Sequence, residues 1–147
     1  MSNLSDFISA GGGKLRYQEF TSSGTFTPSA TLIANGGQAF FELIGGGSSG
    51  QVGYTRAAIG GYAGEYKEGL ITFPDTTPVT VTIGAGGAAV IQTGMIESEG
   101  NSGSASSIGA LAVAAGGAAP ALVSVTTNKA GGGGKGAAGI GYFTTDN

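Results

Sequence analysis

The sequence predicts an all-β fold: a small antiparallel β-sandwich or jelly-roll-like domain with ordered glycine-rich loops and a short N-terminal arm. Three observations favour this fold class. Short alternating or apolar segments recur, with turn residues between them about every eight to twelve positions, as in sandwiches and barrels. β-branched and aromatic residues, which favour strands, occur throughout the chain. Glycine supplies 31 of the 147 residues, and glycine disfavours helices.

The first 13 residues form the predicted N-terminal arm, and residues 14–147 form a single glycine-rich β domain. In the arm, Leu4, Phe7 and Ile8 have the i, i+3, i+4 spacing of one helical face. A helix this short is marginal in water on its own. Two interpretations stay open: the arm is an anchor that orders on a partner protein, or it is a frayed terminus.

Two strands are predicted before the first strong turn. Residues 14–20 alternate, with Leu15 and Tyr17 on one face and Phe20 on the other. Residues 25–28 form a shorter strand, which ends at its proline because proline cannot donate to a sheet ladder.

The turn signal Asn-Gly-Gly at residues 35–37 follows a short apolar segment and precedes the next strand, residues 38–44. This strand contains consecutive apolar residues, so we expect it to be buried on both faces. It runs directly into the first glycine tract.

Residues 45–64 hold glycines interleaved with tyrosine and isoleucine, unlike a flexible linker. We therefore expect this tract to be ordered, with Tyr62 and Tyr66 at least half buried. Two arrangements stay open for this tract and for those at 84–88 and 131–141. They are long loops at one end of a sandwich, or extended polyproline-II-like segments packed side by side, with each N–H bonded to a neighbouring chain.

The second half of the chain continues the strand pattern. Its clearest strand is residues 78–83, where Val79, Val81 and Ile83 face inward and the threonines between them face outward. Polar loops are predicted at residues 74–78 and 97–103. Further extended segments are predicted at residues 65–73, 88–95, 104–113, 121–127 and 142–145.

Composition limits the chemistry that the protein can perform. Cysteine and histidine are absent, which leaves no thiolate metal site and no histidine base. Glu65 and Glu68 would point to opposite faces of a strand, and Glu97 and Glu99 lie in a polar loop. We therefore expect no catalytic residues, no metal site and no cofactor.

Charge and hydropathy limit the partners. The formal net charge is −3 and no basic cluster exists, so nucleic acid is not an expected partner. No apolar run reaches the length of a membrane span, so membrane insertion is not expected. The N-terminus lacks the basic and apolar regions of an export signal.

Two glycine motifs resemble nucleotide-binding loops but lack the necessary context. Residues 84–89 fit the loose dinucleotide fingerprint after a strand, but no helical pattern follows them. Residues 131–136 resemble a phosphate-binding loop, but Lys129 occupies the position of its first glycine and Gly136 follows Lys135 where serine or threonine is required.

Aromatic and basic residues in the glycine tracts are candidate recognition residues: Tyr54, Arg56, Tyr62 and Lys135. Tyrosine on a glycine-rich loop offers a large contact area at low entropic cost. The alternative, which we favour for most of the tyrosines, is that they pin the tracts to the core.

Several motifs, in order, resemble the glycine-rich domain of bacteriophage tail fibres, tail tips and other virion proteins. The most specific is Val-Thr-Val-Thr-Ile-Gly-Ala-Gly-Gly at residues 79–87. Together the matching motifs span residues 20–141. The others lie at residues 20–28 (FTSSGTFTP), 40–47, 60–66 (GGYAGEY) and 102–117.

This resemblance implies a non-enzymatic virion protein that forms a homo-oligomer, and trimers are common in such assemblies. The first hypothesis is a structural component, a capsid decoration or tail-associated protein that docks to other virion proteins through its N-terminal segment. The alternative is an adhesin tip that binds a host surface receptor with its glycine-rich loops. A carbohydrate-processing enzyme is a remote third. The implied location is the virion, after synthesis in the bacterial cytoplasm.

Overall fold

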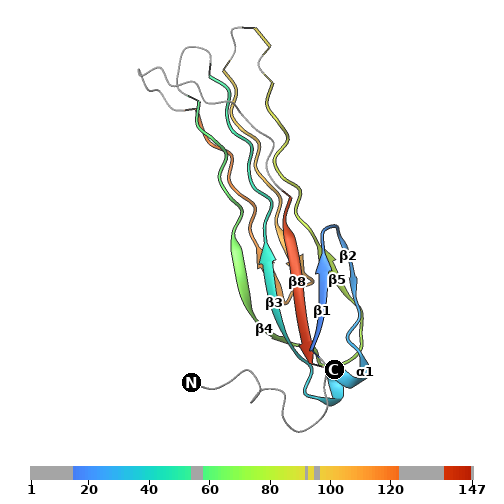
Figure 1. The fold of residues 1–147 in the computed structure, drawn as a ribbon. Helices are drawn as coiled ribbons and strands as arrows, with labels where there is room; N and C mark the ends of the chain where they lie inside the picture. The colour runs from blue at the N-terminus through green and yellow to red at the C-terminus, as the bar shows by residue number, and fades with distance from the viewer. Residues whose placement is uncertain (1–14, 54–57, 92, 95–96, 123–137, 147) are drawn as a thin grey trace, which may run out of the picture.

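The computed structural model describes residues 15–53, 58–91, 93–94, 97–122 and 138–146, and it shows an all-β fold. All strand pairs in the two sheets are antiparallel. The first sheet has the order β1-β8-β3-β4, and the second has the order β2-β5-β6-β7 (Figure 1). The strands are β1 Leu15–Phe20, β2 Gly24–Phe26, β3 Gln38–Ile44, β4 Tyr66–Thr72, β5 Val79–Thr82, β6 Ser106–Ile108, β7 Ala112–Ala114 and β8 Ile140–Asp146.

The closing strand β8 lies inside the first sheet, between β1 and β3. Residue 143 of β8 pairs with Gln18 of β1 on one side and with Phe41 of β3 on the other. The prediction of a strand at 142–145 is therefore confirmed. Backbone hydrogen bonds thus join β8 to β1, two strands far apart in the sequence, and the described part of the sheet requires both strands.

The two sheets pack face to face over one hydrophobic core, as the sandwich prediction requires. Phe41 and Leu43 of the first sheet and Val81 of the second are buried in it. The rings of Phe26 and Phe73 lie 5.1 Å apart, between centroids, at the end of the core near α1 (Ala30–Ala34). The core cluster comprises Phe20, Phe26, Leu32, Ala39, Phe41, Leu43, Ile71, Phe73, Val81, Ile108, Ala112 and Ala114.

Strand β3 corrects one expectation. Its bounds, Gln38–Ile44, match the prediction, but burial alternates along it instead of covering both faces. Ala39, Phe41 and Leu43 are buried, whereas Phe40 is 38 % exposed. One face of β3 therefore supplies the core, and Phe40 is left exposed on the other.

The turn at residues 35–37 is confirmed, but it ends a helix and does not join two strands. α1 begins after Ser29, whose hydroxyl accepts a hydrogen bond from the N–H of Leu32, an N-cap. Gly36 and Gly37 follow with φ of 98° and 69°. These left-handed conformations suit glycine and end the helix.

Residues 104–113 are also corrected, from one extended segment to the β6–β7 hairpin. Gly109, with φ of 49°, lies in its turn. Residues 88–91 and 93–94 contain no strand, so the strand expected at 88–95 is absent from its described part. The extended segment expected at 121–127 and the glycine tract at 131–141 lie mostly outside the described residues.

Candidate functional site

Five segments leave the sheets and run side by side, and we call them the glycine bundle (Figure 1). None of them belongs to a named strand. Segment 45–52 has the others as its hydrogen-bonded or packed neighbours. The segments are residues 45–52, 58–65, 84–91, 97–104 and 115–122.

Hydrogen bonds join the central segment to residues 58–65 at every third position. The N–H groups of Gly45, Ser48 and Gln51 donate to carbonyl oxygens of the neighbouring segment at 2.9, 2.8 and 3.0 Å. The acceptors are Glu65, Tyr62 and Ile59, three residues apart in the opposite direction. This spacing is that of an extended chain with three residues per turn, the polyproline II geometry.

The next N–H group along the central segment points to a different neighbour, residues 97–104. Gly46, Ser49 and Val52 donate at 2.9 Å each to the carbonyls of Ser104, Asn101 and Ser98. On a third side, the carbonyl of Gly47 accepts from the N–H of Gly87 at 2.8 Å. The structure therefore shows packed extended segments in the described residues, and not irregular loops.

Glycine is required where two segments of the bundle are in direct backbone-to-backbone contact. A Cβ atom on Gly61 would lie within 3.0 Å of the Ser48 carbonyl, and one on Gly64 within 3.0 Å of the Gly45 carbonyl. A Cβ atom added at either glycine of the pairs 84 and 87 or 100 and 103 would likewise lie within 3.0 Å of a backbone carbonyl oxygen. Each pair is spaced by three residues, so each pair faces the same neighbour.

Buried serines complete the hydrogen bonding where the bundle joins the sheets and along its centre. Ser106 is fully buried, and its hydroxyl donates to the carbonyl of Ile44 at 2.7 Å while it accepts from the N–H of Gly84 at 2.9 Å. The Ser49 hydroxyl, also fully buried, accepts from the N–H of Asn101 at 2.8 Å. The centre of the bundle is thus polar and hydrogen-bonded, unlike the apolar core of the sandwich.

The tyrosines do not pin the tract as expected. Tyr62 is 52 % exposed and Tyr66 is 53 % exposed, so the prediction that both would be at least half buried is wrong. The reason is that backbone hydrogen bonds hold this segment: the N–H of Tyr62 donates to the Ser48 hydroxyl at 2.7 Å. The aromatic rings are therefore left at the surface.

The end of the bundle away from the sheets is the first candidate site. Val52 and Ser98 form its last described bridge. Ile91 is 79 % exposed, and Leu122, whose N–H donates to Glu99, is also exposed. Of the predicted recognition residues, Tyr62 lies on the side of the bundle. Tyr54, Arg56 and Lys135 lie outside the described residues, as do the arm residues Leu4, Phe7 and Ile8.

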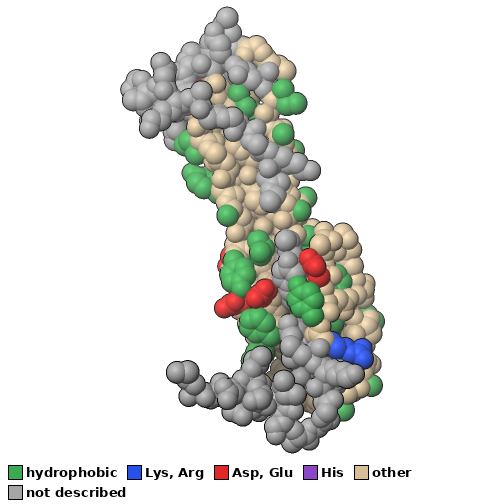
Figure 2. All heavy atoms as spheres, viewed as in Figure 1, with side chains coloured by type: hydrophobic (Ala, Val, Ile, Leu, Met, Phe, Trp, Pro, Cys, Tyr) green, Lys and Arg blue, Asp and Glu red, His purple; other side chains and the backbone are tan. Residues whose placement is uncertain are grey.

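The second candidate site is the solvent-facing side of the first sheet, which we call the outer face. Tyr17, Phe40 and Leu70 lie in one row across β1, β3 and β4, because Tyr17 and Phe40 both pair with residue 144 and Phe40 pairs with Leu70. Tyr17 is 62 % exposed and Leu70 is 68 % exposed. Figure 2 shows hydrophobic and acidic side chains together on this part of the surface.

Three carboxylates form the next row of the outer face. Glu19 and Glu42 both pair with residue 142, and Glu42 lies directly opposite Glu68 on the neighbouring strand. The hydroxyl of Tyr66 donates to Glu68. This hydrogen bond, with smaller effects from desolvation and from Glu42, raises the pKa of Tyr66 from 10.0 to about 12, because the carboxylates disfavour a phenolate.

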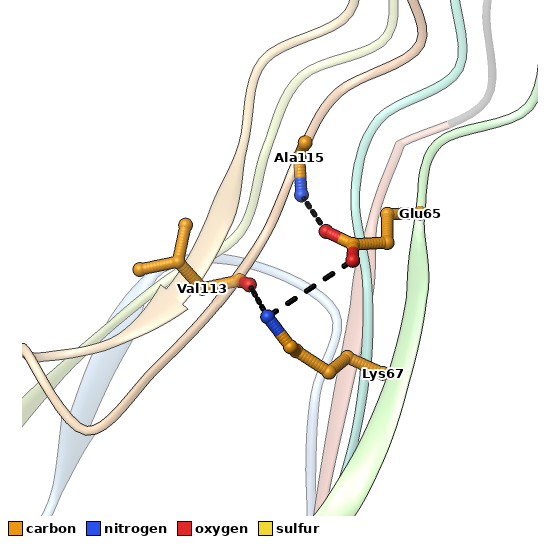
Figure 3. Close-up of polar contacts among 4 residues, drawn as sticks. All are labelled: Glu65, Lys67, Val113 and Ala115. Atoms are coloured by element: carbon orange, nitrogen blue, oxygen red, sulfur yellow. Dashed lines mark hydrogen bonds and ion pairs between the residues drawn. The ribbon is translucent and has the colours of Figure 1, made fainter.

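Glu65 and Lys67 have a structural role at the open side between the two sheets (Figure 3). The Glu65 carboxylate accepts from the N–H of Ala115 at 2.8 Å, and Lys67 donates to the carbonyl of Val113 at 3.0 Å. The two charged groups are 4.0 Å apart. Glu65 and Glu68 thus have separate hydrogen-bond partners.

A shallow apolar cavity of about 330 Å³ lies where the loop after β4 meets the β6–β7 turn. Phe73, Val79 and Leu111 line it, and Asp75 and Thr77 lie at its polar part. Asp75 accepts from the N–H of Thr77 at 2.7 Å, and these hydrogen bonds to Thr77 lower the pKa of Asp75. The carboxylate therefore stabilises its own turn.

Two kinds of feature are absent from the described residues. These residues contain no group of three or more acidic, histidine or cysteine side chains that could hold a metal ion. In that same part of the chain, no helix has the length and apolarity that a membrane crossing needs.

Comparison with known proteins gives one finding. The family model of a glycine-rich domain matches residues 20–146, which is most of the chain. No curated protein and no solved structure matches it.

Proposed function

The chain belongs to the family of glycine-rich domains, and on this premise we propose that it is a non-enzymatic structural component of a bacteriophage virion. In this proposal the sandwich attaches to other virion proteins, and the glycine bundle projects from the particle. The chain motifs that resemble those of phage fibre and tip proteins support the virion assignment. Capsid decoration and tail association are both compatible with it.

The observation that carries this proposal is the hydrogen bonding of the central segment to all four of the other segments. The backbone groups of Gly45, Gly46 and Gly47 make these bonds. Such a bundle is built from backbone hydrogen bonds and needs few large side chains, so a thin rod can form without a wide apolar core. A rod that projects from a sandwich suits a structural protein, because it holds the far end of the bundle away from the surface to which the sandwich attaches.

The carboxylates support a role without catalysis. Glu65 accepts a hydrogen bond from a backbone N–H, Asp75 caps a turn, and Glu68 accepts from Tyr66. A hydrolase of the paired-carboxylate type needs two such groups fixed at one cleft. We therefore retain the carbohydrate-processing enzyme only as an outcome that a hydrolysis assay would reveal.

A host-binding tip is the second candidate function, and the far end of the bundle favours it. Ile91 and Leu122 are exposed there. Residues 53 and 58, which flank Tyr54 and Arg56 in the sequence, are the last described residues at the ends of two bundle segments. In this version the bundle carries recognition loops to a host surface receptor, and homotrimer formation would multiply the contacts.

The test is to locate the protein in assembled particles and to vary its two ends separately. We expect labelled antibody to find it on the outside of the particle. Deletion of residues 1–13 should reduce incorporation if the arm, with Leu4, Phe7 and Ile8, is the anchor, and full incorporation would remove the arm from the proposal. Absence of the protein from particles would contradict the function itself.

The tip function has its own measurement. Purified protein should bind host cells and compete with infection, and substitution of Tyr54 and Arg56 by alanine should abolish this competition while incorporation stays intact. Normal incorporation without any host binding would leave the purely structural function.

A further inference from the structure

We propose that the outer face of the first sheet is a docking surface for a partner protein that presents basic side chains beside apolar ones. This inference deepens the proposed function, and rests on it, by naming the chemistry of the surface to which the sandwich end attaches. The partner is recognised by two adjacent rows of side chains, one apolar and one acidic.

The apolar row is Tyr17, Phe40 and Leu70. Their register places them in a line across four strands, a span of about 14 Å at the usual strand spacing. All three side chains are exposed. Phe40 and Leu70 are direct cross-strand neighbours, and residue 144 of β8 separates Phe40 from Tyr17. Exposed aromatic and aliphatic side chains grouped on a sheet face are typical of protein interaction sites.

The acidic row is Glu19, Glu42 and Glu68. Each lies on the same strand as a member of the apolar row, two residues away, and so on the same face. Beyond the acidic row, Ile44 and Tyr66 form another cross-strand pair on the same face. The carboxylates therefore lie between apolar contacts, where a bound partner would exclude water and strengthen the charge interaction.

The carboxylates of this row are three of the nine acidic residues in a chain of formal net charge −3. The outer face therefore carries a local cluster of negative charge. A partner surface with lysine or arginine complements it, which favours fast and specific association.

The same charge disfavours other occupants. A second copy placed face to face would bring two acidic rows together, which is repulsive. The arm of the chain itself has the apolar residues Phe7 and Ile8, but its one charged side chain, Asp6, is acidic. Neither occupant matches both rows.

The geometry also indicates how the basic group is held. Glu42 and Glu68 lie opposite each other on adjacent strands, and the Tyr66 hydroxyl donates to Glu68. This hydrogen bond engages one carboxylate and leaves Glu42 and Glu68 as a cross-strand pair of acceptors. An arginine, with five N–H donors in a planar fork, suits such a pair.

The experiment uses the full chain, labelled for nuclear magnetic resonance, and two synthetic ten-residue peptides. One peptide alternates arginine with leucine and tyrosine, and the matched peptide has glutamate in place of arginine. We expect the arginine peptide alone to bind, with amide shifts confined to β1, β3 and β4. Glu42→Gln combined with Glu68→Gln should weaken this binding about fivefold, and Glu97→Gln with Glu99→Gln should leave it unchanged.

The other outcomes overturn the proposal. Equal binding of the two peptides, or amide shifts mapped to the glycine bundle or the second sheet, would exclude recognition by charge on this face. A concentration-dependent dimer that Leu70→Ser disrupts would identify a second copy as the occupant. Shifts on the outer face caused by Phe7→Ser would identify the arm. Because the assay needs no particles, its failure and a failure of virion incorporation are separate results.

Discussion

The hydroxyl of Ser106 donates a hydrogen bond of 2.7 Å to the carbonyl oxygen of Ile44, the last residue of β3. Through this contact a strand of the second sheet holds the first sheet at the point where it becomes the glycine bundle. The same hydroxyl accepts from Gly84, where β5 leads into a second bundle segment. One buried side chain therefore joins three segments of the polypeptide at the base of the bundle.

Ser106→Ala should destabilise the protein. The substitution leaves a buried carbonyl and a buried N–H without this partner, which costs about 1–3 kcal/mol in the free energy of unfolding. Urea unfolding monitored by circular dichroism measures the change. Ser104→Ala, at an exposed position two residues earlier, is the matched control and should stay within about 0.5 kcal/mol of the original protein. Equal effects of the two substitutions would contradict the role given to Ser106.

Gly61→Ala should disrupt the bundle, while Gly60→Ala should not. A Cβ atom on Gly61 would collide with the backbone of Ser48 and Ser49, whereas one on Gly60 has no atom within 4 Å. Overpacking against backbone costs about 3 kcal/mol, and alanine at a compatible glycine position stabilises by about 0.4–1 kcal/mol. Thermal unfolding of the two variants compares adjacent residues of the same type. If both were tolerated equally, the close packing of these segments would be refuted.

Tyr66 should ionise at a higher pH than an ordinary tyrosine. Its pKa is raised to about 12, first by its hydrogen bond to Glu68. Ultraviolet titration of the original protein and of Tyr66→Phe isolates this group by difference. Glu68→Gln should lower the pKa toward 10, since it removes the adjacent negative charge. An unchanged titration in Glu68→Gln would contradict the assignment.

The sign of the linked stability follows from the direction of this shift. The pKa of Tyr66 is higher in the folded chain than in the unfolded one, so its contribution to stability is complete below about pH 10. It is lost as the pH rises from about 10 through about 12. Tyr66→Phe should therefore flatten the dependence of stability on pH in this range.

Glu42→Lys should stabilise the fold and weaken partner binding. Glu42 and Glu68 are direct cross-strand partners of like charge, which is unfavourable, and lysine at position 42 would form an opposite-charge pair. We expect a gain of about 0.5–1 kcal/mol in the free energy of unfolding at low salt, which shrinks at high salt. Glu42→Gln separates the removal of repulsion from the new attraction. A loss of stability in both variants would show that the carboxylates do not repel each other.

The strands could be predicted where burial alternates with polarity. Val81 between threonines identifies β5, and the run from Gln38 to Ile44 identifies β3. The face that β3 buries could not be predicted, because Phe40 and Phe41 are the same residue type on opposite sides. The β6–β7 hairpin was missed because its strands consist of serine, alanine and single aliphatic residues, with little contrast between faces.

The candidate sites illustrate a second limit. Glycines at 61 and 64, at 84 and 87, and at 100 and 103 display the period of three in the sequence itself. That period indicates which side of each segment is crowded, but not which segment lies there. Likewise, Glu19, Glu42 and Glu68 belong to separate strands, and only the register places them in one row. The aromatic character of Tyr62 predicts burial, but backbone hydrogen bonds hold its segment and the ring stays exposed.

The three-residue period has a consequence for how such a protein can change in length. Inserting one or two residues into segment 45–52 would rotate every later N–H toward the wrong neighbour, while inserting three would restore the facing of each group. Lengthening is therefore quantised: three residues added to each of the five segments extend the rod by about 9 Å, at 3.1 Å per residue. A lineage of such proteins would vary in reach by whole steps, with the sandwich unchanged.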